Sequence, residues 1–187
     1  PILIRRDIMS TEQSTLDLTQ FGEQGLEGEL TDEISSLRIG SFPNEFFKVC
    51  PDESLVFTGH VVTNSKGEQY LATKDVAHQL ASDAKNRMLV PIVLASGEFM
   101  LLSVAAPSQS NRNNSWVRSG QEAVHKGMQK YIRVTRAGEA FRVIESQKPY
   151  SEVEWLDMSL EEMIELAFGD RLIKDMEHDV VVELLGF

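Results

Sequence analysis

Two neighbouring apolar runs constrain the fold of this chain more than any other feature of its sequence. Met88–Ala95 and Phe99–Ala106 are separated only by Ser96, Gly97 and Glu98, a combination typical of a tight turn. Neither run alternates apolar with polar residues, as a strand with one solvated face would. We therefore expect an antiparallel pair of strands at the centre of a sheet that is covered on both faces.

Two further hairpins are predicted, one before and one after this central pair. Leu55–Thr63 is rich in residues that favour strands and leads through a polar turn into Glu68–Thr73. Tyr131–Arg136 and Ala140–Glu145 flank a turn at Gly138 and alternate apolar with polar residues. The alternation predicts that Ile132, Val134, Phe141 and Val143 point toward a core and that Arg133, Thr135 and Arg142 point outward.

Helices are predicted between and after the hairpins. A serine followed three residues later by glutamate is typical of a helix capping box, and Ser119 with Glu122 and Ser159 with Glu162 have this pattern before helical spacing of apolar residues. The predicted segments are Lys74–Asn86, a helix capped by Ser119 and Glu122, a helix that begins after Ser159 and Glu162 and ends at Gly169, and shorter pieces at Arg171–Met176 and Asp179–Leu185. The expected fold class is α+β, an antiparallel-rich sheet built from three β-hairpins with interleaved and C-terminal helices.

The length of 187 residues fits one domain, because a chain of this size buries most of its surface around a single core. The first part is acidic and punctuated by glycines. We therefore expect an acidic N-terminal arm at residues 1–41 and a single α+β domain at residues 42–187. Helical spacing of apolar residues predicts a short helix within residues 31–37. Residues 1–8 precede Met9, and we interpret them as a vector-derived remnant or an alternative start.

Cys50 is the only cysteine, so no disulfide can form within the chain. Its apolar neighbours in the sequence favour a packed thiol over a catalytic nucleophile. The longest apolar stretch contains Pro91 and is far shorter than the roughly 20 residues of a membrane-spanning helix. No basic segment followed by an apolar one marks a secretory signal. We expect a cytoplasmic protein that has no contact with a membrane.

Charge is distributed unevenly along the chain. The formal net charge is -11, yet residues 111–148 carry eight basic and three acidic side chains. Long basic side chains neutralise phosphates and aromatic ones stack on bases, so this stretch is a candidate nucleic-acid surface. Its candidate contacts, here called the basic strip, are Arg112, Trp116, Arg118, Lys126, Lys130, Arg133 and Arg142. The alternative is that the strip faces acidic segments of the same molecule or lies on a solvated edge.

Residues 149–187 show the opposite bias, with two basic and eleven acidic side chains. This run is a candidate docking surface for a basic protein, with Glu161, Glu162 and Glu165 as candidate contacts. A pair of amphipathic helices with a solvated acidic side is the alternative explanation. A metal site is not expected, because no Glu-x-x-His pattern accompanies these carboxylates.

Motifs for catalysis and cofactor binding are absent from the sequence. The four histidines are scattered and lack the spacing of zinc ligands. No phosphate-binding glycine loop, dinucleotide fingerprint or serine-hydrolase elbow occurs. We therefore expect no metal, no cofactor and no enzymatic activity. A hydrolase or transferase whose site is assembled from distant residues stays open as a third hypothesis.

Two stretches of the chain carry a recognisable pattern. Trp116 to Ala123 and Tyr131 to Val134 contain a tryptophan, a Ser-x-x-Glu-Ala segment and an aromatic-x-Arg-Val strand after a polar loop. This pattern resembles a group of uncharacterised bacterial proteins, and residues 159–179 are similar to the C-terminal end of the same group. The resemblance implies a setting on plasmids, phages and other mobile elements, with no known activity. Trp116 and Arg171 are its candidate shared positions.

Together these features predict a non-enzymatic accessory or binding protein of a mobile-element or phage-defence system. In the first version it contacts nucleic acid or a nucleoprotein complex through the basic strip. In the alternative it is an acidic adaptor or inhibitor that binds a basic protein partner through its C-terminal helices. A protein partner is expected in both versions, and the oligomeric state stays open, with pairing through an exposed edge strand as one arrangement.

Overall fold

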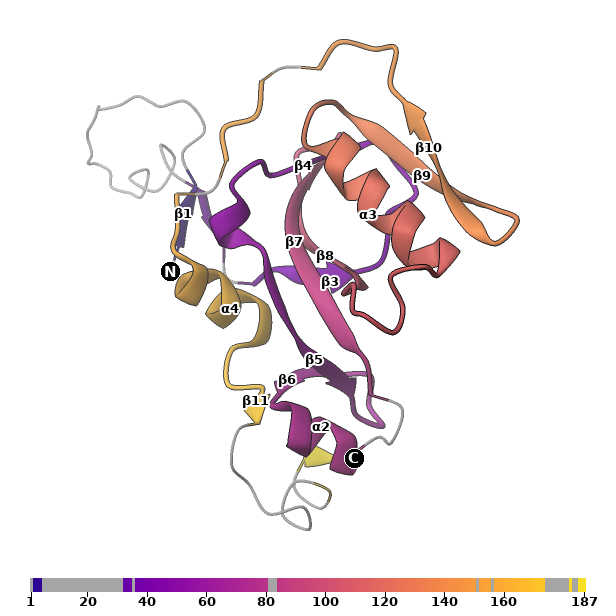
Figure 1. Cartoon of the computed structure of the whole chain (residues 1–187). Coiled ribbons are helices and arrows are strands. Elements are labelled where there is room, and N and C mark those ends of the chain that lie inside the picture. Colours follow the sequence, from indigo (N-terminus) through magenta and orange to yellow (C-terminus); the bar gives the residue numbers. More distant parts are fainter. Residues whose placement is uncertain are drawn as a thin grey trace, which may run out of the picture.

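A nine-stranded, mostly antiparallel open sheet dominates the structure, and three helices accompany it among the described residues (Figure 1). The α+β fold expected from the sequence is thereby confirmed. The structure is a computed structural model that describes residues 2–4, 32–34, 36–80, 84–150, 152–155, 157–173, 182 and 185–187.

The centre of the sheet is the hairpin formed by β7 (Asn86–Leu94) and β8 (Phe99–Ala105). β7 pairs with β8 along one side. Along its other side it pairs with β4 (Phe47–Val49) near its end and with β5 (Phe57–Thr63) near its start. Gly97 makes the reversal between the two central strands at a φ of 98°, which glycine adopts at little cost. The predicted central hairpin is confirmed, and β7 begins two residues earlier than expected.

The sheet divides into two branches where β4 and β5 leave β7. β4 leads to the hairpin of β9 (Ile132–Ala137) and β10 (Ala140–Glu145), and β5 leads to β6 (Gln69–Ala72) and β11 (Leu172–Ile173). On the far side of β8, the parallel strand β3 (Arg38–Gly40) forms another edge. Both outer hairpins predicted from the sequence are confirmed.

The central hairpin is apolar on both faces because a helix covers each face. α3 (Ser115–Gly127) packs on one side and α4 (Leu160–Phe168) on the other, as Figure 1 shows. The cluster under α3 contains Val90, Ile92, Leu94, Met100, Leu102, Ala123, Val124 and Ile132. The cluster under α4 contains Leu89, Leu101, Met163, Ala167 and Phe168. A third cluster lies under α2 (Lys74–Leu80) and includes Tyr70 and Ile173.

The start of α3 differs from the prediction. Asn114 is its N-cap, and the Asn114 side-chain oxygen accepts hydrogen bonds from the backbone N–H groups of Trp116 and Val117. The predicted capping box of Ser119 and Glu122 is therefore wrong, since Ser119 lies one turn inside the helix. An asparagine satisfies free N–H groups at a helix start as well as a serine does, and Asn114 takes this place one turn before Ser119.

The predicted box of Ser159 and Glu162 at the start of α4 is confirmed. The Ser159 hydroxyl accepts from the Glu162 backbone N–H, and the Glu162 carboxylate accepts from the Ser159 N–H at 2.8 Å. Gly169 ends α4, with a φ of 60°. Both termini of this helix follow from local sequence chemistry.

Two segments predicted as helices from apolar spacing contain strands in their described residues. Within residues 31–37 the structure has β2 (Asp32–Ile34), which pairs with β1 (Ile2–Ile4). At Arg171–Met176 it has β11, whose backbone extends the sheet by pairing with β6. Arg171 holds this segment in place, since its guanidinium donates to the backbone oxygens of Gln69 and Ala167. Hydrogen bonds to an available sheet edge outweighed the weak helical pattern.

Other boundaries are corrected or lie outside the description. The helix predicted over Lys74–Asn86 ends at Leu80 in α2, and Asn86 already belongs to β7. Leu37 is buried and β3 follows it, so the last residues assigned to the N-terminal arm pack into the sheet. Most of the helical piece expected at Asp179–Leu185 lies outside the described residues. In the described part of the chain, no helix is long and apolar enough to cross a membrane.

Two glycines of α3 give a matched test of how this helix packs. A Cβ at Gly120 would meet only the Phe141 ring at 3.7 Å, whereas a Cβ at Gly127 would lie 2.5 Å from Val49 Cγ2. We expect Gly120→Ala to raise the free energy of unfolding by about 0.5–1 kcal/mol through helix propensity. We expect Gly127→Ala to lower it by about 1–3 kcal/mol through overpacking. Urea denaturation followed by circular dichroism measures both, and equal shifts of one sign would contradict this packing.

Candidate functional site

A cavity of about 420 Å³ lies between the start of α3, the β9–β10 hairpin and the end of β8. We call it the α3 cavity. Its lining includes three aromatic residues, two arginines, two serines and a threonine, and no carboxylate. These polar and aromatic lining residues are Phe42, Trp116, Phe141, Arg87, Arg136, Ser41, Ser103 and Thr135. Its volume falls within the range of about 300–1,000 Å³ that is typical of ligand pockets.

Three aromatic rings from separate elements form one wall of the cavity. Phe141 of β10 lies between the other two, with its centroid 5.0 Å from that of Trp116 and 4.8 Å from that of Phe42. Both contacts are edge-to-face, which is a favoured arrangement of aromatic pairs. Trp116 comes from the first turn of α3 and Phe42 from the segment after β3. The wall therefore exists only when helix, hairpin and sheet are assembled.

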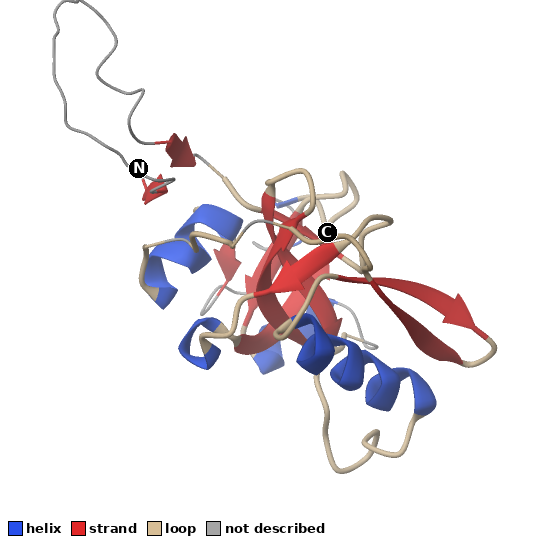
Figure 2. Cartoon of the chain, turned by 90° about the horizontal axis from the view of Figure 1, so that it is seen from above, coloured by secondary structure: helices blue, strands red, loops and turns tan. Residues whose placement is uncertain are grey.

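Ser119 joins the hairpin to the helix. Its hydroxyl donates to the Ser115 carbonyl at 2.6 Å and accepts from the Phe141 backbone N–H at 2.8 Å. Figure 2 shows the β9–β10 hairpin extending beyond the rest of the sheet alongside α3. The serine that the sequence suggested as a helix cap thus positions the central ring of the aromatic wall.

Arg87 brings a half-buried positive charge to the cavity. Its Nε donates to Ser103 Oγ at 2.9 Å and its Nη2 to the Ser103 carbonyl at 3.0 Å. Burial lowers the pKa of the Arg87 guanidinium from its usual value, but an arginine side chain stays protonated in proteins. Among the described residues, no carboxylate forms an ion pair with it. A partly desolvated cation without a counter-ion favours binding of an anion or of strong acceptors.

Arg136 adds a second cation where the cavity meets solvent. It lies directly opposite Phe141 in the hairpin, and its Cζ is 5.2 Å from the centroid of the Trp116 ring. The residue is exposed, so this cation–π contact leaves the guanidinium in reach of a ligand. No acidic partner of Arg136 occurs in the part of the chain that the structure describes.

The structure divides the basic strip into separate groups. Lys126 and Lys130 both pair with Glu145, at 3.0 and 3.1 Å, and these two lysines lower the pKa of the Glu145 carboxyl. Arg133 and Arg142 point to the other face of the hairpin, where the Arg133 Cζ lies 5.5 Å from the Phe46 ring centroid. The predicted outward orientation of these two arginines agrees with the register, as the pairing of Val134 with Val143 places those two side chains on the inner face.

The remaining members of the strip are Arg112, Arg118 and Trp116. Arg112 lies in the polar loop before α3 and Arg118 on α3, and both are exposed. Neither forms an ion pair with any residue that the structure describes. Trp116 alone of the strip lines the α3 cavity. Two of the seven strip residues thus share the carboxylate of Glu145, whereas the arginines of the strip form no ion pair with any described residue.

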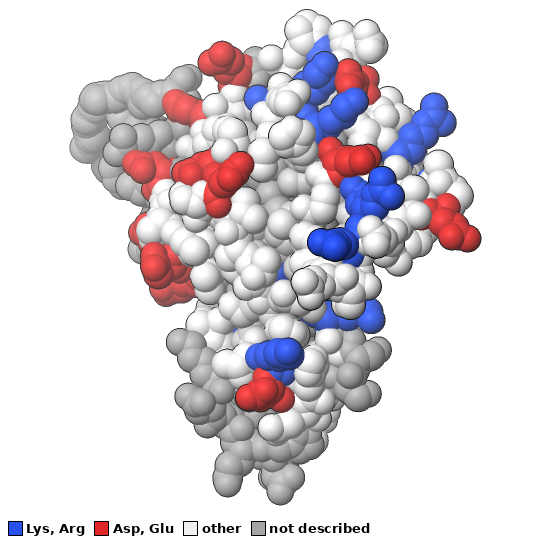
Figure 3. All heavy atoms as spheres, viewed as in Figure 1, with Lys and Arg blue, Asp and Glu red and all other residues white. Residues whose placement is uncertain are grey.

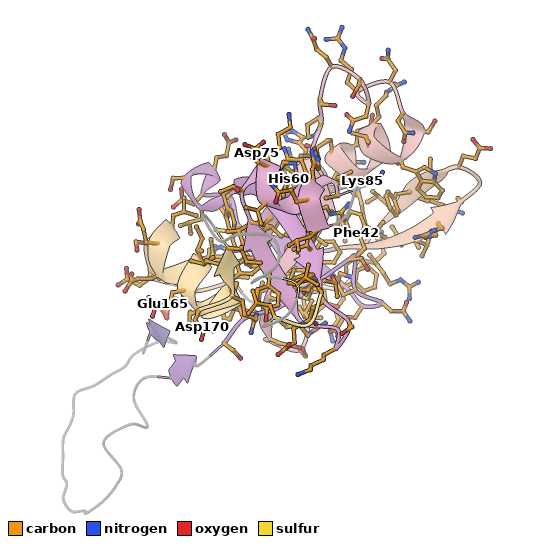
Figure 4. The ribbon with its side chains drawn as sticks, turned by 90° about the horizontal axis from the view of Figure 1, so that it is seen from below. Phe42, His60, Asp75, Lys85, Glu165 and Asp170 are labelled. Atoms are coloured by element: carbon orange, nitrogen blue, oxygen red, sulfur yellow. The ribbon has the colours of Figure 1, made fainter. Side chains whose placement is uncertain are left out.

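Acidic side chains gather on the opposite side of the molecule. In Figure 3 Asp and Glu cover much of the side where α4 lies, while Lys and Arg concentrate over α3 and the hairpin. Figure 4 shows Glu165 and Asp170 on the α4 side, away from Phe42. Of the three acidic candidates, Glu161 and Glu165 are exposed, and the Glu162 carboxylate serves the helix cap. The basic surface therefore does not face the acidic helix.

Other reactive side chains do not form a chemical site in the described residues. Cys50 is buried and its burial raises the pKa of the thiol, as expected for a packed cysteine. His60 and His78 meet edge to face at 5.5 Å, and burial with the nearby His78 and Lys74 lowers the pKa of His60. Within these residues, no group of three or more potential metal ligands occurs.

Sequence reasoning missed Arg87, Ser103 and Phe42 as lining residues. One signal was present, because Arg87 is a charged residue at the start of an otherwise apolar run. A charge that enters a central strand needs polar partners, and Ser103 provides them from the neighbouring strand. Nothing in the sequence pairs Phe42 with Phe141, since nearly a hundred residues separate them.

Replacing Ser119 tests whether the helix holds the hairpin. Ser119→Ala leaves the Phe141 N–H without its acceptor, so we expect the free energy of unfolding to fall by about 1 kcal/mol. Hydrogen exchange at the Phe141 amide is expected to become faster. Ser115→Ala, on the same helix, is the control and is expected to leave that amide protected. Equal exchange in the two variants would refute this role of Ser119.

No family model matches the chain, and no curated protein and no solved structure shows significant similarity to it. The function of the protein is therefore inferred from the geometry and charge of the α3 cavity and its surroundings.

Proposed function

We propose that this protein is a non-enzymatic accessory protein that binds single-stranded nucleic acid, free or within a nucleoprotein complex, through α3 and the β9–β10 hairpin. The observation that carries the proposal is the α3 cavity, where Arg87 and Arg136 accompany an aromatic wall and no carboxylate balances them. The mobile-element or phage-defence setting is part of the proposal and rests on the resemblance of the segment around Trp116.

Arginines around α3 and the β9–β10 hairpin support binding of an anionic partner. In a chain with net charge -11, acids are available to pair with every arginine, yet Arg112, Arg118, Arg136 and Arg142 form no ion pair with the described residues. Arginine binds phosphate through paired N–H donors, so a cluster of free guanidinium groups favours a phosphate-bearing partner. The acidic α4 side would turn away from such a partner.

The aromatic wall favours a single strand over a duplex. Bases in a duplex are stacked on one another, whereas those of a single strand are free to stack on Trp, Tyr or Phe. Trp116 and Phe141 border a hollow rather than a flat surface, and a hollow admits one unstacked ring at a time. A duplex would present only its phosphates to this surface.

An enzymatic role has less support from the cavity. Its lining serines are Ser41 and Ser103, Thr135 directs its side chain to the other hairpin face, and no histidine, cysteine or carboxylate is among the lining residues. A hydroxyl nucleophile needs an adjacent base to become reactive. The acidic adaptor reading also has less support, because solvation and the capping box account for the glutamates of α4.

Salt dependence of binding tests the proposal. We expect a labelled single strand to bind with a logarithmic affinity that falls against logarithmic salt with a slope of about -2 to -3, as about four phosphate contacts would give. Fluorescence anisotropy between about 50 and 200 mM salt measures it. Duplex of the same length is expected to bind more weakly. Absence of binding to single-stranded DNA and RNA at the lowest salt would refute the proposed function.

Glu145 gives a second, gain-of-affinity test. Because it neutralises Lys126 and Lys130, Glu145→Gln releases two lysines for phosphate contacts. We expect tighter binding of the single strand and a salt slope steeper by about one to two units. Glu139→Gln, at the exposed turn of the same hairpin, removes one negative charge without releasing a lysine. If the two variants bind alike, the lysines do not contribute to the surface.

A further inference from the structure

We infer that the α3 cavity holds one nucleotide, with its base against the aromatic wall and the acceptor edge of that base on Arg87. This inference deepens the proposed function and rests on it for the polymer. The same chemistry is offered by a free mononucleotide and by one nucleotide of a strand, and the experiment below separates these two sources. Guanine is the base that fits the donors best.

The first support is the combination of shape and lining. A planar ring needs an apolar surface to stack on and polar groups at its edge, and ligand pockets typically combine the two. Trp116, Phe141 and Phe42 supply the surface, and Arg87 supplies the edge beside Ser41 and Ser103. Gly120 of α3 also lines the cavity, and the space next to its Cα is open except for the Phe141 ring.

The second support is the orientation of the Arg87 guanidinium. Its Nε and Nη2 donors hold Ser103, which occupies one edge of the planar fork. The other edge, between Nη1 and Nη2, keeps a pair of parallel N–H donors that no described residue accepts. Guanine presents O6 and N7 as neighbouring acceptors, and arginine recognises them with such a donor pair. Ser103 therefore fixes the orientation of the Arg87 guanidinium and leaves the edge between Nη1 and Nη2 available to a base.

The third support is the position of Arg136. It is exposed beside Trp116, whereas Arg87 is half-buried. A nucleotide whose base enters the cavity leaves its phosphate at the solvent side, where an exposed guanidinium meets it. Two cations at different depths thus match the two polar ends of one nucleotide, which a phosphate ion or an apolar molecule would not use together.

The indole N–H signal of Trp116 in a nitrogen–proton NMR spectrum reports directly on the cavity. The chain has two tryptophans, and Trp155→Phe assigns the signals, because Trp155 contacts Phe99 in the α4 cluster. We expect guanosine monophosphate to shift the Trp116 signal with saturation, and the adenosine, cytidine and uridine monophosphates to bind about tenfold or more weakly. Equal affinities for all four, or no shift with any, would overturn the assignment.

Two variants distinguish a specific cavity from general charge. Arg87→Gln is expected to abolish the preference for guanine, whereas Arg142→Gln, with the same loss of charge on the other hairpin face, is expected to weaken all strands alike. Gly120→Leu fills the cavity from α3 without touching Arg87, and we expect it to lose the shift with every nucleotide. Retention of guanine preference in Arg87→Gln, or of the Trp116 shift in a folded Gly120→Leu, would overturn the inference.

Strands with and without bases separate this inference from the proposed function. Anisotropy compares a guanine-containing single strand with an abasic strand of equal length and charge. Tighter binding of the guanine-containing strand, with a shift of the Trp116 signal, supports both the proposed function and the nucleotide site. Equal binding of the two strands with no shift of the Trp116 signal keeps the proposed function and overturns the assignment of the cavity to a nucleotide. A shift with free guanosine monophosphate but no binding of any strand overturns the proposed function and assigns the cavity to a free nucleotide.

Discussion

Burial of the central hairpin on both of its faces is the constraint on which the rest of the structure depends. β7 and β8 alternate their side chains between two clusters, one under α3 and one under α4. An apolar strand pair that met water on either face would lose the main stabilising contribution of a domain this size. The two helices must therefore lie on opposite sides, and this separation also separates the acidic from the basic surface.

This separation leaves one side of the molecule acidic and the opposite side basic. α4 carries its glutamates outward on one side, and on the other side the arginines around α3 and the hairpin form no ion pair with any described residue. On the basic side Glu145 pairs with two lysines of the basic strip, and Glu122 and Glu139 lie on α3 and at the hairpin turn. Two arginines, Arg87 and Arg136, line the α3 cavity together with its aromatic wall.

Local chemistry made much of the fold predictable, and long-range contacts account for what was missed. The hairpins at Gly97 and Gly138 and the cap at Ser159 follow from a few adjacent residues. Adjacent residues did not predict β11, because its extended form depends on the hydrogen bond from Arg171 to the Gln69 carbonyl across the sheet. The residues of the candidate site likewise include some that local sequence predicted and some that it did not. Trp116 was identified from its polar and basic neighbours in the sequence, whereas Arg87 and Phe42 reach the cavity only through packing of distant segments.

The attachment of the β9–β10 hairpin has a consequence for its motion. β9 meets the sheet through a single pair, Phe47 with Ile132, so few backbone hydrogen bonds hold it there. Its position depends instead on side chains of α3 and on Ser119. Fewer backbone hydrogen bonds join this hairpin to the sheet than join β7 to β8, so we expect it to open at a lower free energy than the central strands. Phe141 would then move more readily than the Arg87 guanidinium, which Ser103 anchors to the central strands.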